Sequence, residues 1–288
     1  MAELSGARQV GIGFIGLGNI GAPMARQLLK LSEPVNVYDL DAARTTALAA
    51  HGARAAASIA DLARGSRIVG VCVRDEAQVE GVLDGPGGLL ANLPADAVIA
   101  IHSTVTQAAI LRWGGAAAAR GMRLIDAPVT GGAPAAQAGT LTYMVGGDAA
   151  VLERCRPVFM TSGQKVIHAG PPGAGILLKL CNNLMSYAAF AAIGEAERLA
   201  RAGGLDVALL SEVGRSNGVV TPQMEAFAGN RATLATAGPQ ALERAFGPFA
   251  ALAEKDLAAA LASARELGVS LPATERLGAL IAGVFLNP

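Results

Sequence analysis

The sequence predicts an α/β domain built on a doubly wound parallel sheet, followed by an all-α domain and joined to it by a long helix. The first half alternates short β-branched runs with alanine-rich helical runs, which is typical of parallel strands covered by helices on both faces. After the breaker "GPPGAG" at 170–175, no convincing strand follows. A chain of 288 residues with 52% hydrophobic residues can fill one large or two medium domains. We therefore place an α/β domain at 1–170 and an all-α domain at 171–288, which begins with the long helix.

The individual elements follow from local patterns. The expected strands are short and β-branched and cover 10–16, 35–39, 67–73, 97–102, 123–129 and 141–147. The expected helices between them are 19–32, one that ends near residue 50, 75–83, 106–119 and 148–160. One helix of about 172–203, roughly 45 Å long at about 1.5 Å per residue, leads to further helices near 206–214, 239–267 and 272–284.

Charge and composition exclude several classes of partner. Basic and acidic residues cancel at 23 each and no basic cluster stands out, so neither nucleic acid nor an anionic membrane surface is an expected partner. The longest charge-free stretch, 127–147, is rich in Gly, Thr and Pro and is not typical of a membrane helix. Small molecules are the expected partners.

Cysteine usage and the N-terminus indicate a cytoplasmic protein. Cys72, Cys155 and Cys181 are scattered, odd in number and without metal-ligand spacing, so we expect neither a disulfide framework nor a metal site. The opening "MAELSGARQV" is too polar and short for a signal peptide.

A glycine motif follows the first expected strand and opens the first expected helix. Gly16, Gly18 and Gly21 form a GxGxxG pattern, with Asn19 and Ile20 completing the turn. The first glycine permits the tight turn, the second lets the backbone approach a pyrophosphate, and the third lets helix and strand pack closely. The phosphates then lie at the helix N-terminus. This context predicts dinucleotide binding on a Rossmann-type domain.

The end of the second expected strand bears on the choice of dinucleotide. Asp39 lies 18 residues after Gly21, where a carboxylate can accept hydrogen bonds from the ribose hydroxyls and repel a 2′-phosphate. NAD is therefore favoured. Two alternatives remain open: Asp39 or Asp41 caps the next helix, or Arg44 neutralises the phosphate of NADP.

Two later strand ends carry polar groups at the sheet edge where ligands bind. In "DAPVTGGAPAAQAGTL" (126–141), Thr130 offers a hydroxyl and Gly131–Gly132 expose backbone N–H groups, a combination able to hold a carboxylate, although an ordinary turn is equally compatible. In "HSTVTQAAI" (102–110), Ser103 and Thr104 lie at that edge, or one of Ser103, Thr104 and Thr106 caps the following helix. We expect His102 to be a partly buried strand residue.

Lys179 is one of only four lysines and lies in the apolar run "GAGILLKLCNNL" (173–184). Asn183 follows one helical turn later on the same face, with Asn182 beside it. Burial lowers the pKa of a lysine towards neutrality, the range that acid–base catalysis needs. An amine and an amide in this arrangement suit a hydroxyl that gains or loses a proton. Alternatively, Lys179 extends along the helix to water and the asparagines are incidental.

Taken together, these stretches resemble the β-hydroxyacid dehydrogenase family, which includes hydroxyisobutyrate dehydrogenases and tartronate semialdehyde reductases. The resemblance runs in order along nearly the whole chain. The matching segments are "GFIGLGNIGAPMARQLL" (13–29), with Ile20 where Met is usual, Ser103–Thr104, "DAPVTGG" (126–132), with Thr130 replacing Ser, the Gly173, Gly175, Lys179, Asn182 and Asn183 pattern, and "EKDLAAA" (254–260).

The resemblance implies an oxidoreductase that transfers a hydride between NAD(P) and a small β-hydroxyacid or its semialdehyde. Lys179 would be the catalytic acid/base, and Asn183 would bind the substrate hydroxyl or carboxylate. The remaining roles would be substrate binding by Thr130, Gly131, Gly132 and Asn182, and cofactor binding by Gly16, Gly18, Asn19, Ile20, Gly21, Asp39, Val73, Arg74, Thr104 and Lys255. Asp39–Leu40 fits the NAD-using members. Family folds have a Rossmann-type domain, a long interdomain helix and a helical domain that forms homodimers or homotetramers.

Two departures from the family pattern concern cofactor affinity and the substrate. Arg74 stands where the family carries Pro, near the adenine side, and 214–223 lacks an aromatic residue that often follows its serine. Two other functions remain open, an imine reductase and a non-catalytic nucleotide-binding protein. Imine reductases usually carry Asp or Tyr in place of Lys179, and a protein without catalysis has no need of the Lys–Asn pair. Phosphogluconate dehydrogenase shares motifs with the chain but has a far longer helical domain.

Overall fold

The computed structural model describes residues 11–287. Within them the chain forms two compact units that divide inside one helix, between Lys179 and Leu180. We call them the α/β unit and the helical unit. Val10, where the first expected strand begins, lies outside the described residues.

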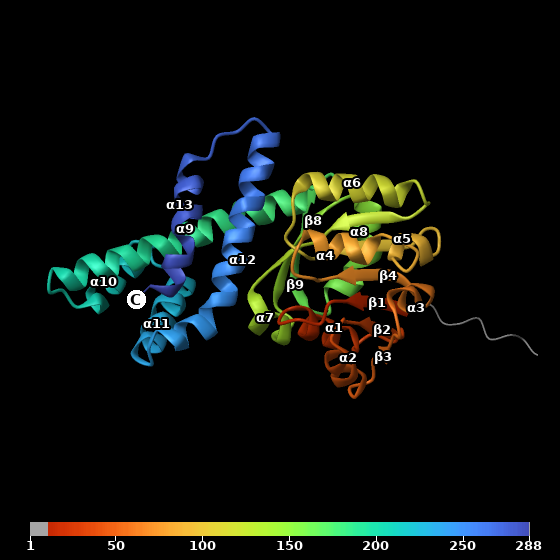
Figure 1. The fold of residues 1–288 in the computed structure, drawn as a ribbon, viewed down its shortest axis with the longest axis horizontal. Helices are drawn as coiled ribbons and strands as arrows, with labels where there is room; N and C mark the ends of the chain where they lie inside the picture. The colour runs from red at the N-terminus through yellow and green to blue at the C-terminus, as the bar shows by residue number, and fades with distance from the viewer. Residues whose placement is uncertain (1–10, 288) are drawn as a thin grey trace, which may run out of the picture. The chain divides into compact units, whose positions relative to one another are not determined.

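The α/β unit contains nine strands and eight helices, and the long helix α9 begins in it (Figure 1). The strands are β1 (Gly11–Ile15), β2 (Val35–Tyr38), β3 (Arg54–Ala55), β4 (Ser66–Val71), β5 (Val98–Ile101), β6 (Arg123–Asp126), β7 (Val129–Thr130), β8 (Leu141–Gly146) and β9 (Gly163–Gly170). The helices are α1 (Gly21–Leu28), α2 (Ala42–Ala49), α3 (Ile59–Arg64), α4 (Glu76–Leu83), α5 (Leu89–Asn92), α6 (Gln107–Ala118), α7 (Gly132–Ala138), α8 (Ala149–Phe159) and α9 (Ala174–Ala202). The expected strands and helices of this part are confirmed, except that the strand expected over 123–129 is divided into β6 and β7, and β3, β9, α3, α5 and α7 were not expected.

The sheet has the order β3-β2-β1-β4-β5-β6-β8, and β7 and β9 both pair with β8. The strands from β3 to β6 are all parallel. The expectation of a wholly parallel sheet is wrong at β8, which runs antiparallel to β6 and β7. Only the short helix α7 separates β7 from β8, so the chain returns directly instead of crossing over, and a direct return produces an antiparallel pair.

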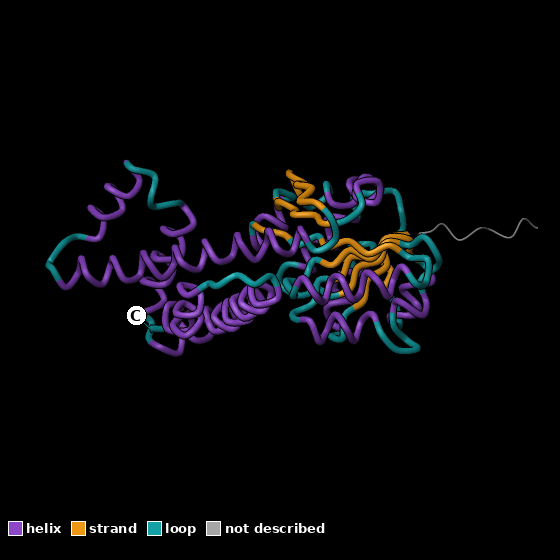
Figure 2. Tube along the Cα trace, turned by 90° about the horizontal axis from the view of Figure 1, so that it is seen from above, coloured by secondary structure: helices purple, strands orange, loops and turns teal. Residues whose placement is uncertain are grey.

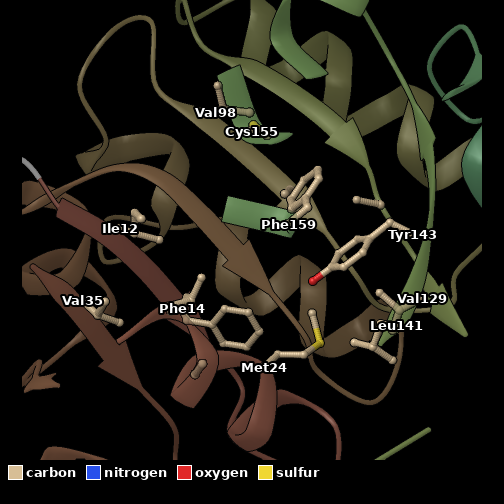
Figure 3. Packing of buried hydrophobic residues seen from close by; sticks show 14 of the residues in the cluster. Ile12, Phe14, Met24, Val35, Val98, Val129, Leu141, Tyr143, Cys155 and Phe159 are labelled. Carbon is tan, nitrogen blue, oxygen red and sulfur yellow. The ribbon is translucent and has the colours of Figure 1, made fainter. Parts of the chain in front are cut away.

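Successive side chains of the central strands point to opposite faces of the sheet, as strand geometry requires. Ile12 and Phe14 of β1 pack on one face with α1 and α8, and Ile15 packs on the other with residues of α3 to α6. Figure 2 shows helices of this unit on both sides of the strands. Large side chains fill the first face, where Phe14 and Tyr143 of the sheet lie near Met24 and Phe159 of the helices (Figure 3). The doubly wound α/β prediction is confirmed.

The helical unit consists of the rest of α9 together with α10 (Val207–Ser216), α11 (Pro222–Thr236), α12 (Pro239–Glu266) and α13 (Pro272–Leu286). α12 and α13 run side by side in opposite directions (Figure 1). Its core is aromatic: Phe190 stacks on Phe227 with ring centroids 4.4 Å apart, and Phe285 meets both edge-on. The all-α prediction is confirmed, and α11 is the helix that the sequence pattern did not predict.

Helix α9 is the one helix in the described part of the chain that is long and apolar enough to cross a membrane, by length and composition alone. Of its most apolar 18-residue window, 28% is buried. Ile176 belongs to the core of the α/β unit, whereas Tyr187 and Ile193 belong to the core of the helical unit. The long connecting helix is confirmed, with observed bounds Ala174–Ala202.

Candidate functional site

Most candidate residues of the α/β unit follow the carboxyl ends of parallel strands. Because β1, β2, β4, β5 and β6 are parallel, their carboxyl ends meet at one edge of the sheet, where ligands bind in such folds. The segments that follow them are 16–21 after β1, Asp39 after β2, Val73–Arg74 after β4, Ser103–Thr104 after β5 and Thr130–Gly132 after β6 and the short β7. The fold brings the predicted cofactor and carboxylate residues of this unit to the same edge.

The glycine turn has the geometry that the motif requires. Gly16 has φ +92°, and a Cβ on it would collide with the carbonyl of Cys72. A Cβ on Gly21 would collide with the carbonyl of Gly16. By contrast, a Cβ on Gly18 would meet nothing nearer than Arg44, at 4.0 Å. Two glycines therefore make the turn possible and the third leaves open space above it, a cradle that fits a pyrophosphate at the start of α1.

Asp39 is fixed beside this turn. Its carboxylate accepts hydrogen bonds from the N–H of Leu17 at 2.6 Å and of Asp41 at 2.8 Å. Arg44 lies 3.8 Å from it and also pairs with Asp41 at 3.2 Å. The residue that caps α2 is Asp41, which accepts the N–H of Ala43. Asp41 and not Asp39 therefore caps α2, and the carboxylate of Asp39 is held beside the glycine turn.

The loops after β4 and β5 are tied together by Ser103. Its hydroxyl donates to the carbonyl of Val73 at 2.8 Å and accepts the N–H of Val73 at 3.0 Å. The cap of α6 is Thr106, which accepts the N–H of Ala109. Thr104 is half-buried in the same loop, and the side chain of Arg74 is 76% exposed. Ser103 therefore has a positioning role that the sequence did not reveal.

The segment expected to anchor a carboxylate forms a turn at the end of β7. Thr130 pairs with Thr142 of β8. Gly131 and Gly132 then have φ of +124° and +70°, in the region that favours glycine. The hydroxyl of Thr130 and the N–H groups of this turn are compatible with binding a carboxylate.

Lys179 lies in the second turn of α9 and is half-buried. The apolar run around it is buried along one stripe only: Ile176, Leu180 and Asn183 are buried, while Leu178 and Cys181 are exposed. The start of the helix is bonded to Asp126 at the end of β6. Lys179 is therefore carried by a helix whose first turn is attached to the edge where the strands end.

In the helical unit, the remaining candidates form one buried polar network. Asp256 is 3% exposed and its Oδ2 accepts hydrogen bonds from Asn183 at 2.7 Å and from the hydroxyl of Tyr187 at 2.9 Å. Its Oδ1 faces the ammonium of Lys255 at 2.8 Å. Burial, together with the charge of Asp256, raises the pKa of Tyr187, so this hydroxyl stays a donor. Asn182, half-buried, donates to the amide oxygen of Asn183 at 3.4 Å.

Sequence reasoning missed Asp126, Asp256 and Tyr187, and it placed Ser103 at the sheet edge without its hydrogen bonds to Val73. Asp126 and Asp256 both lie inside motifs that were recognised, "DAPVTGG" and "EKDLAAA". Both residues are carboxylates that lie within a buried strand or helix face. This was the signal that could have identified them, because a charge is buried only where it is paired or hydrogen-bonded.

Other titratable groups have structural surroundings. His102 is buried, and its Nδ1 bonds the carbonyl of Ala127 at 2.8 Å. Burial lowers its pKa to about 4, so it is neutral at physiological pH, in agreement with the structural role expected for it. The three cysteines are free. Among residues 11–287 no group of three or more His, Cys, Asp or Glu side chains is arranged to hold a metal ion.

Two family models match the chain and together cover nearly all of it. Residues 11–170 match the NAD binding domain of 6-phosphogluconate dehydrogenase. Residues 173–284 match the NAD-binding domain of NADP-dependent 3-hydroxyisobutyrate dehydrogenase.

Relatives with named activities match along most of their length. The NAD-dependent L-serine dehydrogenase of Pseudomonas aeruginosa is 38% identical over 261 residues, covering 91% of this chain and 87% of the relative. The 3-hydroxyisobutyrate dehydrogenase of the same organism is 37% identical over 274 residues, covering 95% and 90%. The solved structure of Mycobacterium tuberculosis 3-hydroxyisobutyrate dehydrogenase with L-serine has a TM-score of 0.82 at 28% identity, covering 95% of this chain and 93% of that one.

These matches define the class of protein. The chain belongs to the 3-hydroxyisobutyrate dehydrogenase-like family of hydroxyacid dehydrogenases, and it is an NAD(P)-dependent oxidoreductase. Imine reductases from Pseudomonas sp. and Streptomyces aurantiacus also match, at 17% and 21% identity, and these show the shared fold alone.

Proposed function

We propose that the protein is a dehydrogenase of a small β-hydroxyacid, with Lys179 as its acid/base. The observation that carries this proposal is the position of Lys179 in the second turn of α9. The first turn of that helix is bonded to the end of β6, and Asn183 follows one helical turn later. The relatives named as dehydrogenases of 3-hydroxyisobutyrate and L-serine support a substrate in which a hydroxyl lies close to a carboxylate.

In the proposed mechanism the substrate carboxylate binds the Thr130 hydroxyl and the N–H groups of the Gly131–Gly132 turn. Lys179, neutral before the reaction, takes the proton of the substrate hydroxyl during oxidation and returns a proton to the carbonyl oxygen during reduction. Asn183, with Asn182 beside it, holds the same oxygen through its amide. The buried Asp256 accepts one Nδ2–H of Asn183, which leaves the second Nδ2–H of that amide to donate to the substrate oxygen.

NAD(P), when bound, supplies the centre that accepts or donates the hydride. We propose that Gly16, Gly18, Asn19, Ile20 and Gly21 bind its phosphates. Asp39 binds the ribose and so favours NAD over NADP. Val73 and Arg74 would lie near the adenosine part, and Thr104 and Lys255 near the nicotinamide.

Three broader features complete the proposal. The functional division follows 1–170 for dinucleotide binding and 171–288 for substrate binding and oligomerisation. The protein is a cytoplasmic homodimer or homotetramer. Its partner is a small carboxylate, with no nucleic acid or membrane involved.

The proposal is tested by nicotinamide absorbance over a panel of small β-hydroxyacids and their semialdehydes, with NAD(H) and NADP(H). We expect turnover of at least one β-hydroxyacid, with a higher kcat/KM for NAD than for NADP. Cyclic imines with NADPH form the competing arm. Reduction of imines without any hydroxyacid oxidation would favour the imine reductase, and tight NADH binding without turnover of any compound would favour a non-catalytic nucleotide-binding protein.

A further inference from the structure

We propose that Asp126 is a positioning residue that holds the first turn of α9, and Lys179 with it, against the carboxyl edge of the sheet. This inference rests on the proposed role of Lys179. Asp126 does not reach the reacting atoms in this proposal; it acts through the helix that carries the lysine.

The hydrogen bonds of Asp126 go to the helix start. Asp126 is the last residue of β6 and is fully buried. Its Oδ1 accepts the N–H of Gly173 at 2.8 Å and its Oδ2 accepts the N–H of Ile176 at 2.7 Å. The first N–H groups of a helix have no partner within the helix, and Gly173, which precedes α9, has no side chain to cap them. A carboxylate 47 to 50 residues earlier in the chain does so instead, and its negative charge suits the positive end of the helix dipole.

Two glycines make room for this carboxylate. A Cβ on Gly146 of β8 would lie 2.5 Å from Oδ1 of Asp126, and a Cβ on Gly175 would lie 2.9 Å from Oδ2. Both distances are too short for real contacts, so any larger residue at either position would displace the carboxylate. The site is therefore packed to the shape of one Asp side chain.

The buried charge is costly and is offset by backbone donors. Burial raises the pKa of Asp126 above its usual range, and the N–H groups of Gly173 and Ile176 act in the opposite direction. A helix start can be capped by an exposed Ser, Thr or Asp at little cost. A buried carboxylate at the end of a strand also fixes the position of the helix relative to the sheet, which a cap from the helix's own sequence does not.

In this proposal Asp126 sets the distance between Lys179 and Thr130, two parts of the proposed site. Lys179 follows Ile176 by three residues, about 4.5 Å along the helix axis. Thr130 follows Asp126 by four residues in the same segment. Asp126 thus links the helix that carries the acid/base to the segment that carries the carboxylate anchor. A misplacement of about 1 Å between reacting groups costs about 10²-fold in rate.

The test compares Asp126→Asn with Asp148→Ala. Asp148 caps α8 through the N–H of Ala150, so its loss also weakens a helix start in the α/β unit but one without a proposed catalytic residue. We expect kcat of Asp126→Asn to fall about 10²-fold, with the affinity for NADH, measured by fluorescence, unchanged. Hydrogen exchange should accelerate in the peptide spanning 173–181 only in Asp126→Asn. Asp148→Ala should keep its kcat.

Each outcome decides the proposal. If Asp126→Asn keeps the wild-type kcat, or loses no more than Asp148→Ala, the positioning role is excluded. The exchange measurement needs no activity, so it separates this inference from the proposed function: a wild-type protein silent on every substrate contradicts the proposed function alone. If Asp126→Asn does not fold, amide exchange in the wild type decides, because the N–H groups of Gly173 and Ile176 should be protected as strongly as those inside α9. Rapid exchange at Ile176 would overturn the assignment.

Discussion

Buried polar side chains are the residues on which both the fold and the proposed site depend. His102 bonds the carbonyl of Ala127 and is enclosed by aromatic rings, stacked on Phe14 and edge-on to Tyr143 and Phe159. His102 is neutral in the folded protein, because the surrounding rings offer no partner for a charged imidazole. As the pH falls, His102 is therefore protonated in the unfolded chain before it is protonated in the folded protein.

Substitution of His102 by Gln should flatten the acid side of the stability profile. The pKa of His102 is about 4 in the folded protein, against 6.5 for an unperturbed histidine. As pH falls from 6.5 to 4 the unfolded chain takes up a proton that the folded protein does not, so the free energy of unfolding falls by about 3 kcal/mol, at about 1.4 kcal/mol per pH unit. Urea unfolding at pH 7.5 and pH 4.5 measures this, and an equal pH dependence in wild type and His102→Gln would contradict it.

Asp256→Asn should destabilise the protein more than Tyr187→Phe. The first change removes the charge that Asn183, Tyr187 and Lys255 all contact, and the second removes a single donor. Hydrogen bonds to buried charges contribute about 1.5–3 kcal/mol each and neutral ones about 1, so we expect a loss of about 2–3 kcal/mol for Asp256→Asn and about half of that for Tyr187→Phe. Denaturant unfolding gives both values. Equal losses would show that Tyr187 is the only important partner.

At the scale of elements, Gly16 and Gly18 have different roles in the turn between β1 and α1. Gly18→Ala should leave the melting temperature unchanged, because its Cβ would have 4.0 Å of space, and should weaken NADH binding by obstructing the phosphates. Gly16→Ala should destabilise the fold itself, since φ is +92° and the carbonyl of Cys72 blocks a Cβ. Thermal unfolding and NADH fluorescence titration distinguish the two. Unaltered NADH affinity in Gly18→Ala would place the phosphates elsewhere.

The sequence predicted elements well where a local pattern decides them. β-branched runs such as 67–73 became strands, and alanine-rich runs became helices. β9, "GQKVIHAG", was missed because it has neither alternation nor a continuous apolar run, and its inner residues are only half-buried or exposed. The direction of β8 depends on where the chain returns to the sheet, which no local pattern encodes.

The candidate site divides in the same way. Gly16, Asp39 and Lys179 were proposed from spacing and residue type, because each lies in a stretch whose local pattern singles it out. Asp126 and Asp256 were missed because the residues that donate hydrogen bonds to them lie 47 or more and 69 or more residues away. A carboxylate whose hydrogen-bond donors are distant in the sequence has no local sequence pattern, apart from its occurrence in a buried segment.

At the scale of the whole molecule, α9 contributes side chains to the cores of both units. The α/β unit has a buried cluster on each face of its sheet, one of which contains Ile176 of α9, and the helical unit has an aromatic cluster that contains Tyr187 and Ile193 of α9. The aromatic core of the helical unit should therefore be sensitive to loss of a single ring.

Phe227→Ala should lower the free energy of unfolding by about 3–5 kcal/mol, the usual effect of removing a buried phenyl ring. Phe227 is 7% exposed and contacts the rings of Phe190, Phe246 and Phe285. The matched control is Phe249→Ala, because Phe249 is 48% exposed and its loss should change stability by no more than about 0.5 kcal/mol. Comparable losses from the two variants, followed by circular dichroism in denaturant, would contradict the assignment of this core.

The central claim is that Lys179 performs acid/base chemistry on a β-hydroxyacid. The most direct measurement is NADH-linked turnover of wild type, Lys179→Ala and Lys165→Ala on one active substrate, with NADH affinity measured in parallel. Lys165 is exposed on β9 and serves as the control for loss of a lysine. We predict that Lys179→Ala loses about 10²–10⁴-fold in kcat while binding NADH normally, and that Lys165→Ala matches the wild type. A Lys179→Ala protein that binds NADH and turns over at the wild-type rate would contradict the claim.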